Sequence, residues 1–314
     1  MKKNLTPEQK KKRAKKARII IIAIVLFITI SNAIATKIIY DSIFKRYDGE
    51  PRFDTAPYAE IVDSRMEISV AEGDESLKAY FYDAENEKGI IVIAPGLHAG
   101  ADDYLPMTEY FVEDGWDVFA FDPLGTNGSS GKSTVGFSQE IYDLDAVLDY
   151  VEVTYPEEEI YLFGHSRGGF AVCSMMESNH KIKAVCSVSG LNSAMEAVIG
   201  LSSRYIGPVA NANYFDLWLY QVILFGADTM AKQADDAITD TDIPVIIIQG
   251  TEDETAPMDK YSVYSHKDEI DPVDVVYSIR DEEGSNGHTD LMFDEDGVND
   301  ELMLEIVTFF EGVE

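Results

Sequence analysis

The sequence predicts an α/β fold with a mostly parallel central sheet, helices on both faces of that sheet and a small helical cap, preceded by one N-terminal transmembrane helix. Six short apolar runs of strand length alternate with segments of helical period, which is typical of a parallel sheet covered on both faces. An uncharged run of 18 residues lies close to the N-terminus. With 314 residues, 46% of them hydrophobic, the chain has enough apolar material for a buried core.

The N-terminal segment carries the signals of a membrane anchor. Residues 1–18 hold nine Lys or Arg residues and a single acid, Glu8. Residues 19–36 are uncharged and long enough, at the lower limit, to span a bilayer core as a helix. Because positive flanks stay in the cytoplasm, we expect a single-pass protein of the cell membrane, with everything after Lys37 on the extracytoplasmic side.

A cleaved signal peptide is the alternative interpretation of the same segment. Ala33, Ile34 and Ala35 offer small residues at the spacing of a cleavage site, which would release a secreted protein. We favour a retained signal anchor because the uncharged run continues to Thr36. The predicted organisation is a basic cytoplasmic segment (1–18), a transmembrane anchor (19–36), a linker (37–60) and one folded domain (61–314) with a cap insertion at about 191–241.

Charge and cysteine content exclude several classes of function. The chain has 57 acidic and 25 basic residues, a net charge of −32, and nine of the basic residues precede residue 19. A body this acidic repels phosphate backbones, so we expect no nucleic-acid partner. The two cysteines, Cys173 and Cys186, are too few for a disulfide framework or for a four-ligand zinc site. We expect buried free thiols, although the sequence leaves open whether the two residues pair.

Apolar patterning predicts each element of the sheet in order. Alternation on both sides of Glu72, Gly73 and Asp74 predicts an antiparallel hairpin over residues 66–81. The six apolar runs are predicted strands buried on both faces and span residues 89–96, 116–123, 159–166, 182–190, 244–250 and 273–281. Segments whose apolar residues have helical spacing separate or follow these runs. Examples are Ile141, Leu144, Leu148 and Val151, and Leu302, Ile306, Phe309 and Phe310 near the C-terminus.

A motif with chemical meaning follows the third of these runs. Gly164-His165-Ser166-Arg167-Gly168 has the G-x-S-x-G pattern and stands between a predicted strand and a predicted helix. That context is the one a nucleophile elbow requires, because a turn this tight tolerates almost no side chain at its flanking positions. The turn lifts the serine oxygen above the sheet at a helix N-terminus. Ser166 is therefore the predicted nucleophile.

An activated serine needs a base, and the base needs an orienting acid. In this kind of fold the chain order is Ser, then Asp or Glu, then His. Asp253 follows the run that ends at Gly250, and His288 follows the run 273–281. Of the other histidines, His98, His165 and His180 precede the acid, and His266 falls in a predicted surface helix. The sequence thus predicts a catalytic triad of Ser166, Asp253 and His288.

The oxyanion formed during acyl transfer needs backbone N–H donors. One predicted donor is the amide of Arg167, directly after the nucleophile. The other is the amide of Leu97, in the loop after the strand ending at Ala94, where Gly96 lets the backbone approach closely. We interpret His98, beside them, as an ordinary loop histidine.

Taken together, these motifs resemble the α/β-hydrolase superfamily over roughly residues 61–312. The motifs that carry the resemblance are APGLHAG, FDPLGTNGSSG, GHSRGG, GTEDETAP and NGHTD, in that order. The chain looks most like serine esterases and acylaminoacyl-peptidase-like members with a short helical cap. It departs from them at Pro95 and at Gln249, where such proteins often carry His. Neither departure removes a group of the triad.

The predicted cap contains an almost wholly apolar segment, Tyr214–Phe225, which is too short to span a membrane. We interpret it as a helix over the active site. Its aromatic residues Tyr214, Phe215, Trp218 and Tyr220 are candidate walls of a substrate pocket, with plain packing against the body as the alternative.

The resulting hypothesis is an exported, membrane-tethered serine hydrolase that cleaves carboxylic esters or related acyl bonds of a small molecule through an acyl-enzyme. The chemistry requires no metal and no organic cofactor. An exopeptidase or amidase on the same triad is an alternative, and so is a catalytically silent surface binding domain. The sequence does not identify the substrate or the oligomeric state.

Overall fold

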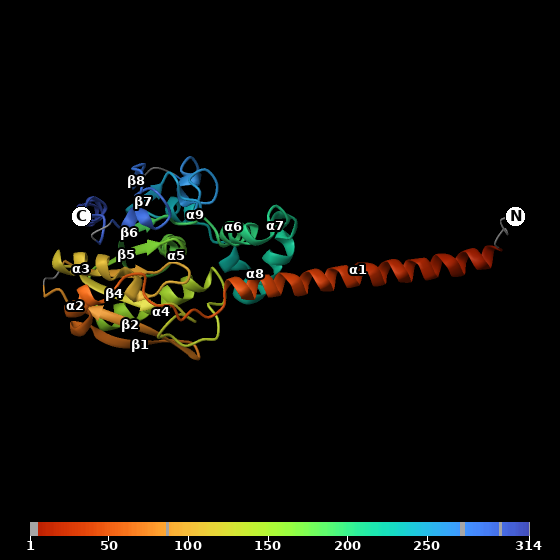
Figure 1. Ribbon diagram of the computed structural model, residues 1–314, viewed down its shortest axis with the longest axis horizontal. Helices are drawn as coiled ribbons and strands as arrows, with labels where there is room; N and C mark the ends of the chain where they lie inside the picture. The colour runs from red at the N-terminus through yellow and green to blue at the C-terminus, as the bar shows by residue number, and fades with distance from the viewer. Residues whose placement is uncertain (1–5, 86–87, 271–273, 295–296, 314) are drawn as a thin grey trace.

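The computed structural model describes residues 6–85, 88–270, 274–294 and 297–313, and Figure 1 shows its arrangement. A mixed body of strands and helices lies at one end, and one long N-terminal helix projects from it. The fold predicted from the sequence is confirmed: a mostly parallel sheet covered by helices on both faces.

Eight strands form one sheet in the order β1-β2-β4-β3-β5-β6-β7-β8. Their bounds are β1 Met66–Glu72, β2 Glu75–Tyr82, β3 Ile90–Ala94, β4 Asp117–Asp122, β5 Ile160–His165, β6 Ile182–Val188, β7 Val245–Gly250 and β8 Val275–Arg280. The first two strands form the predicted antiparallel hairpin, and β2 also pairs antiparallel with β4. All other pairs are parallel. The predicted run 273–281 begins at a residue outside the described ones.

The helices complete the layers. The α-helices are α1 Pro7–Ile43, α2 Ala59–Ser64, α3 Leu105–Glu113, α4 Gln139–Thr154, α5 Arg167–Ser174, α6 Ala194–Ile206, α7 Val209–Ala212, α8 Tyr214–Met230, α9 Ala234–Thr239 and α10 Asp300–Glu311. The 3-10 helices are η1 Ala56–Tyr58, η2 Ala101–Tyr104, η3 Met175–Glu177, η4 Val263–His266 and η5 Asp290–Met292.

The core is divided by the sheet because successive strand residues face opposite sides. In β3, Ile90 and Val92 pack on the face covered by α4, α5 and α9, whereas Ile91 and Ile93 pack on the face covered by α3 and α10. All residues of β3 are buried, as expected for a strand covered on both faces. This two-sided burial explains why β3 to β7 appear in the sequence as continuous apolar runs. The last run differs from the prediction: β8 is the edge strand, and of its residues Ser278 alone is buried.

The segment after the apolar run differs from the prediction. Helix α1 does not end at Thr36 but continues to Ile43, so residues 37–43 of the predicted linker 37–60 are helical. Tyr40, Ile43 and Phe44 are buried against the body. These three residues share one helix face, a spacing that the charged residues between them obscured.

The rest of the predicted linker is also attached to the body. Arg46 donates hydrogen bonds to the backbone carbonyls of Asn127, Ser129 and Gly131 at 2.7, 3.0 and 2.8 Å. Tyr47 forms a β-bridge with Thr126. Helix α1 is therefore held by the body at its C-terminal end, while nearly all of residues 7–35 is exposed.

Helices α6, α7 and α8 form the cap and gather around the end of α1 that is closest to the body (Figure 1). The predicted apolar helix is present as α8, which includes a non-helical residue, Gly226, with φ of +82°. Glycine adopts this conformation without steric cost, so the helix bends there rather than ending.

Candidate active site

The nucleophile elbow lies where β5 ends and α5 begins. Ser166 stands between them with φ of +56°, a conformation that non-glycine residues rarely adopt. A side chain at Gly164 would collide with the backbone of Gly168, and one at Gly168 would collide with the Ala94 carbonyl. The two glycines of the motif are thus required by close backbone contacts, and the backbone of β6 holds the turn through the Ser166 N–H, which donates to the Val188 carbonyl at 2.9 Å.

The other two predicted triad residues come from the loops after β7 and β8, and the structure brings both of them to Ser166. His288 Nε2 lies 2.8 Å from Ser166 Oγ, and His288 Nδ1 lies 2.8 Å from Asp253 Oδ2. The Glu252 N–H donates to the Asn286 carbonyl at 2.9 Å, which ties the two loops together. This geometry allows a proton to pass from the serine hydroxyl to the imidazole while the carboxylate fixes the tautomer.

Asp253 is almost fully buried and is held as a carboxylate by its surroundings. Its Oδ1 accepts the N–H groups of Thr255 and Ala256, each at 2.8 Å, and Gln249 Nε2 donates to its Oδ2 at 3.2 Å. Burial alone would raise the pKa of Asp253, but the hydrogen bond and charge of His288 and the two amides outweigh it and lower the pKa. Gln249, noted in the sequence as a departure from related proteins, thus contacts the predicted acid.

The predicted oxyanion donors flank Ser166. The amide of Arg167 is the first of α5, and the first amides of a helix have no acceptor within the helix. Leu97 lies in the loop after β3 and is one of the residues that line the cavity at Ser166. A Cβ at Gly96 would come within 3.5 Å of the Ser166 Cβ, so this loop closely approaches the elbow. His98, which follows, has φ of +59° and stacks on Tyr47 at 5.2 Å between ring centroids.

A buried hydrogen-bond network, which no sequence pattern predicted, links this loop to the His288 loop. The Gly96 N–H donates to Tyr104 Oη at 2.9 Å, and Tyr104 Oη lies 2.9 Å from His165 Nδ1. His165 Nε2 lies 2.9 Å from the His288 carbonyl oxygen, which can only accept. Burial lowers the pKa of His165 to about 3, so the ring is neutral, with its proton on Nε2 and Nδ1 accepting from Tyr104.

The side chain of Arg167 has a second environment, separate from its amide. It is fully buried and pairs with Glu140 of α4, which is also fully buried. Burial raises the pKa of Glu140 to about 8, and the guanidinium opposes this rise. Replacing either partner would leave a buried charge or a buried polar group uncompensated.

A cavity of about 280 Å³ opens beside Ser166 and His288. The described residues that line it are Ile43, Leu97, His98, Phe137, Ser166, Leu191, Leu201, Arg204, Thr255 and His288. Ile43 is the last residue of α1, so the N-terminal helix ends in the wall of this cavity. These walls come from separate segments of the chain, which is why the sequence alone did not identify them.

The predicted pocket residues of the cap lie elsewhere. Among the described residues, Tyr214, Phe215, Trp218 and Tyr220 are absent from the lining of this cavity. Phe215 is 65% exposed and Tyr214 is 50% exposed, whereas Tyr220 packs edge-on against Tyr40 of α1 at 5.0 Å between ring centroids. The cap helix packs beside α1 instead of reaching over Ser166 with these side chains.

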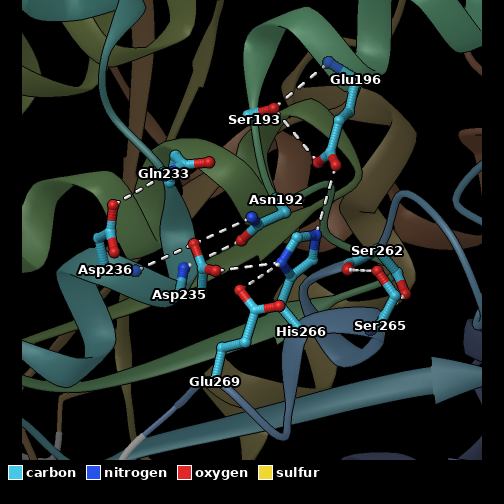
Figure 2. A network of polar contacts seen from close by, with 10 residues as sticks. All are labelled: Asn192, Ser193, Glu196, Gln233, Asp235, Asp236, Ser262, Ser265, His266 and Glu269. Carbon is cyan, nitrogen blue, oxygen red and sulfur yellow. Dashed lines mark hydrogen bonds and ion pairs between the residues drawn. The ribbon is translucent and has the colours of Figure 1, made fainter.

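His266 lies outside the triad, in a separate polar cluster (Figure 2). Its Nε2 lies 3.3 Å from Glu196 of α6, and its Nδ1 lies 3.1 Å from Asp235 of α9 and 3.4 Å from Glu269. The ligand atoms of Asp235, His266 and Glu269 are close enough to hold a metal ion. However, the carboxylates of Asp235 and Glu269 both already contact His266 Nδ1. His266 belongs to η4 and is only partly exposed, so the predicted surface helix is a short, half-buried turn that connects cap and body.

Cys173 and Cys186 are both buried and both free, as expected from the sequence. Burial raises the pKa of both thiols, which keeps them protonated and unreactive.

Comparisons with known proteins agree with the fold. Residues 85–215 match the model of the serine aminopeptidase S33 hydrolase family. An esterase from Pyrococcus furiosus superposes with a TM-score of 0.65 at 17% identity, over 86% of this chain and 99% of that one. A thermostable carboxyl esterase from Bacillus coagulans superposes with a TM-score of 0.58 at 16% identity, over 80% of this chain and 99% of that one. Est1E from Butyrivibrio proteoclasticus superposes with a TM-score of 0.57 at 19% identity, over 78% of this chain and 96% of that one. No curated protein matches the chain. The chain has the α/β-hydrolase fold, and its resemblance to this superfamily is confirmed.

Proposed function

We propose that this protein is a membrane-anchored serine hydrolase that cleaves carboxylic esters of small molecules. Ser166 Oγ attacks the acyl carbon while His288 takes its proton, and the amides of Leu97 and Arg167 stabilise the developing oxyanion. His288 then gives the proton to the departing alcohol, which leaves an acyl-enzyme. A water molecule, deprotonated by His288, releases the acid and restores the serine. Asp253 orients the imidazole throughout.

One observation carries this proposal: the serine hydroxyl, imidazole and carboxylate stand in a line with two contacts of 2.8 Å. The strained conformation of Ser166 adds support, because backbone strain of this kind concentrates at functional sites. The esterase neighbours share the fold but are less than 20% identical, so they support the hydrolase class rather than a particular substrate.

The lining of the cavity favours an ester over the N-terminus of a peptide. An aminopeptidase has to bind a positively charged amine, for which a carboxylate close to the serine is the natural partner. The residues that line the cavity, among those described, include one cation, Arg204, and no carboxylate. Its remaining walls are mainly aliphatic and aromatic, which suits an uncharged acyl or alcohol group.

The proposed anchor is α1, oriented with its basic end in the cytoplasm. Thr36, Tyr40 and Ile43 of this helix are buried, and Asn32 donates to Asn213 Oδ1 of the cap at 2.8 Å. Signal cleavage after Ala35 would cut this continuous helix and remove the contact of Asn32 with the cap, whereas Thr36, Tyr40 and Ile43 would stay in the mature protein. The continuity of the helix and the Asn32 contact support a retained anchor over a secreted protein. Among the residues described, α1 is the one apolar helix of spanning length.

Active-site labelling tests the hydrolase assignment. A fluorophosphonate probe should label the wild-type protein and the control variant Ser69→Ala, whose exposed serine lies on the edge strand β1, but not Ser166→Ala. A protein that no fluorophosphonate labels would be the silent binding domain. Hydrolysis of p-nitrophenyl esters should then exceed that of aminoacyl p-nitroanilides, and the reverse order would make the protein an amidase or exopeptidase.

Protease treatment of intact cells tests the anchor and its orientation. The body should be removed from the outside, while an epitope placed before Pro7 should stay protected until lysis. Protection of the whole chain would refute the orientation, and loss of the epitope from the mature protein would favour signal cleavage.

A further inference from the structure

An exposed apolar face on the cap is not used by the cavity at Ser166. Phe215, Leu219 and Ile223 of α8 lie four residues apart, on one side of the helix, and are 65%, 41% and 71% exposed. Val209, Tyr214 and Leu224 of the cap are exposed as well. We call Phe215, Leu219 and Ile223 the cap face. Apolar surface of this kind is costly in water at about 25 cal/mol per Å².

The charge of the cap also differs from that of the rest of the body. The cap helices, residues 194–230, hold one basic residue, Arg204, and three acidic residues, Glu196, Asp216 and Asp228, so the cap carries −2 within a chain of net charge −32. An acidic surface is repelled by anionic lipid headgroups, whereas an apolar face without charged residues is not. The cap face is thus the part of the body best suited to lie against a membrane.

The cap face is fixed beside the proposed anchor by hydrogen bonds. Asn32 of α1 donates to Asn213 at 2.8 Å and to Asp216, and Asn213 donates to Thr36 Oγ1 at 2.7 Å. One turn further along α1, Lys37 donates to Tyr220 at 3.2 Å. Figure 1 shows α7 and α8 beside this part of α1, while the preceding turns project free of the body. The polar groups between the helices satisfy one another, as a membrane environment requires.

The length of α1 sets the depth of these contacts. A helix rises 1.5 Å per residue, so Asn32 stands roughly 20 Å from Ile19, the first residue after the basic segment. The hydrocarbon core of a bilayer is about 30 Å thick. If the core begins at Ile19, the level at which Asn32 meets the cap lies inside the opposite leaflet and not above it.

We propose that the cap face lies in the leaflet on the catalytic side of the bilayer that α1 spans, so that lipid covers Phe215, Leu219 and Ile223. This inference rests on the proposed anchoring of α1 and adds a second membrane contact made by the folded body. Ile43, which follows the same helix into the wall of the cavity at Ser166, then brings that cavity close to the lipid surface.

Site-directed fluorescence in vesicles tests the proposal without depending on activity. The full chain is reconstituted in phosphatidylcholine and phosphatidylglycerol vesicles after labelling single cysteines with the dye NBD. Ile223→Cys and Leu219→Cys probe the cap face, Val25→Cys probes the anchor, and Val153→Cys, 82% exposed on α4, is the aqueous control. The two native cysteines are buried, so the unmodified protein provides the background.

We expect brominated acyl chains to quench the dye at positions 25, 219 and 223, and aqueous iodide to quench it severalfold less there than at 153. Iodide quenching at 223 equal to that at 153, with position 25 still quenched by lipid, would overturn the cap contact while leaving the anchor intact. Loss of lipid quenching at position 25 would refute the anchor itself, and the cap contact with it. A dye at 223 shielded from both quenchers would mean that a second copy covers the cap face, which also overturns the proposal.

Discussion

Two histidines of this protein, His288 and His266, have similar contacts at ring nitrogen Nδ1 and different contacts at Nε2. His288 places Nδ1 2.8 Å from the buried carboxylate of Asp253, and His266 places Nδ1 3.1 Å from the buried carboxylate of Asp235. The other nitrogen of His288 faces the hydroxyl of Ser166 at 2.8 Å. The other nitrogen of His266 faces a further carboxylate, that of Glu196, at 3.3 Å.

The difference shows which histidine can act as a base. Burial alone would lower the pKa of His266, but the charges of Glu196 and Asp235 outweigh it and raise the pKa. An imidazole between carboxylates holds its proton more tightly, and both of its ring nitrogens face carboxylates instead of a substrate. At the other site a neutral hydroxyl stands where the second carboxylate would be, so Nε2 can take a proton from it. The same residue type therefore serves as a candidate base in one place and as an ionic tie between cap and body in the other.

The largest expected effect is the loss of Ser166 or His288. Ser166→Ala and His288→Ala should each lower kcat/KM for p-nitrophenyl esters by about 10⁴ or more, because triad members act as a unit. The matched control is His266→Ala, which should keep activity close to that of the wild type. Near-normal turnover in His288→Ala, or an equal loss in His266→Ala, would break the distinction between the two histidines.

Asp253→Asn should reduce kcat by about 10³ to 10⁴ while the fold is preserved. The asparagine amide donates where the carboxylate accepts, which would hold His288 in the tautomer whose Nε2 already carries a proton. Asp235→Asn, the equivalent change at His266, should leave kcat unaltered. Equal activity in the two variants would show that the carboxylate at residue 253 does not orient the base.

A smaller effect is expected at the hydrogen-bond network behind the site. Tyr104→Phe removes the donor to His165 and the acceptor for the Gly96 N–H, and so loosens the loops that carry Leu97 and His288. Losing a hydrogen bond worth about 1 to 1.5 kcal/mol should lower kcat roughly tenfold. KM should change little, since Tyr104 is absent from the cavity lining among the described residues. A rise in KM at constant kcat would assign Tyr104 to substrate binding instead.

The contrast between the two histidines also marks what could be predicted from the sequence. Ser166 and Asp253 follow buried strands, and His288 follows the partly exposed edge strand β8. Because the carboxyl ends of parallel strands meet at one edge of the sheet, local patterns sufficed to predict their neighbourhood. Their catalytic roles stay a prediction. The partners of His266 come from α6, α9 and the loop after η4, and no local pattern indicates that these segments meet.

The same reasoning explains why the cap and the end of α1 differ from what the sequence predicts. The apolarity of α8 predicts that its aromatic residues are covered, and hence that they wall the pocket. The sequence did not reveal that α1 would continue to Ile43 and occupy the cavity wall itself, which leaves Phe215 exposed on the other side. The apolar composition predicted that this helix is covered. It did not predict that α1 covers it, because α1 is 170 residues or more away in the chain.

The smallest expected effect concerns the pH dependence of stability at His266. Because its pKa is raised in the folded protein, its ion pairs contribute fully below the unfolded pKa of about 6.5 and are lost as pH rises through the folded value. His266→Gln should therefore reduce the free energy of unfolding at pH 5.5 by about 1 kcal/mol or less, since water screens this partly exposed ring. At pH 9 the difference in free energy of unfolding between the variant and the wild type should be smaller. The measurement is urea unfolding of the full chain in detergent, followed by tryptophan fluorescence.

His98→Gln is the matched control, because burial lowers the pKa of His98. The difference in free energy of unfolding between this variant and the wild type should change with pH in the opposite direction. A gap for His266→Gln that widens with rising pH would show that its carboxylate partners do not hold the ring in the charged form.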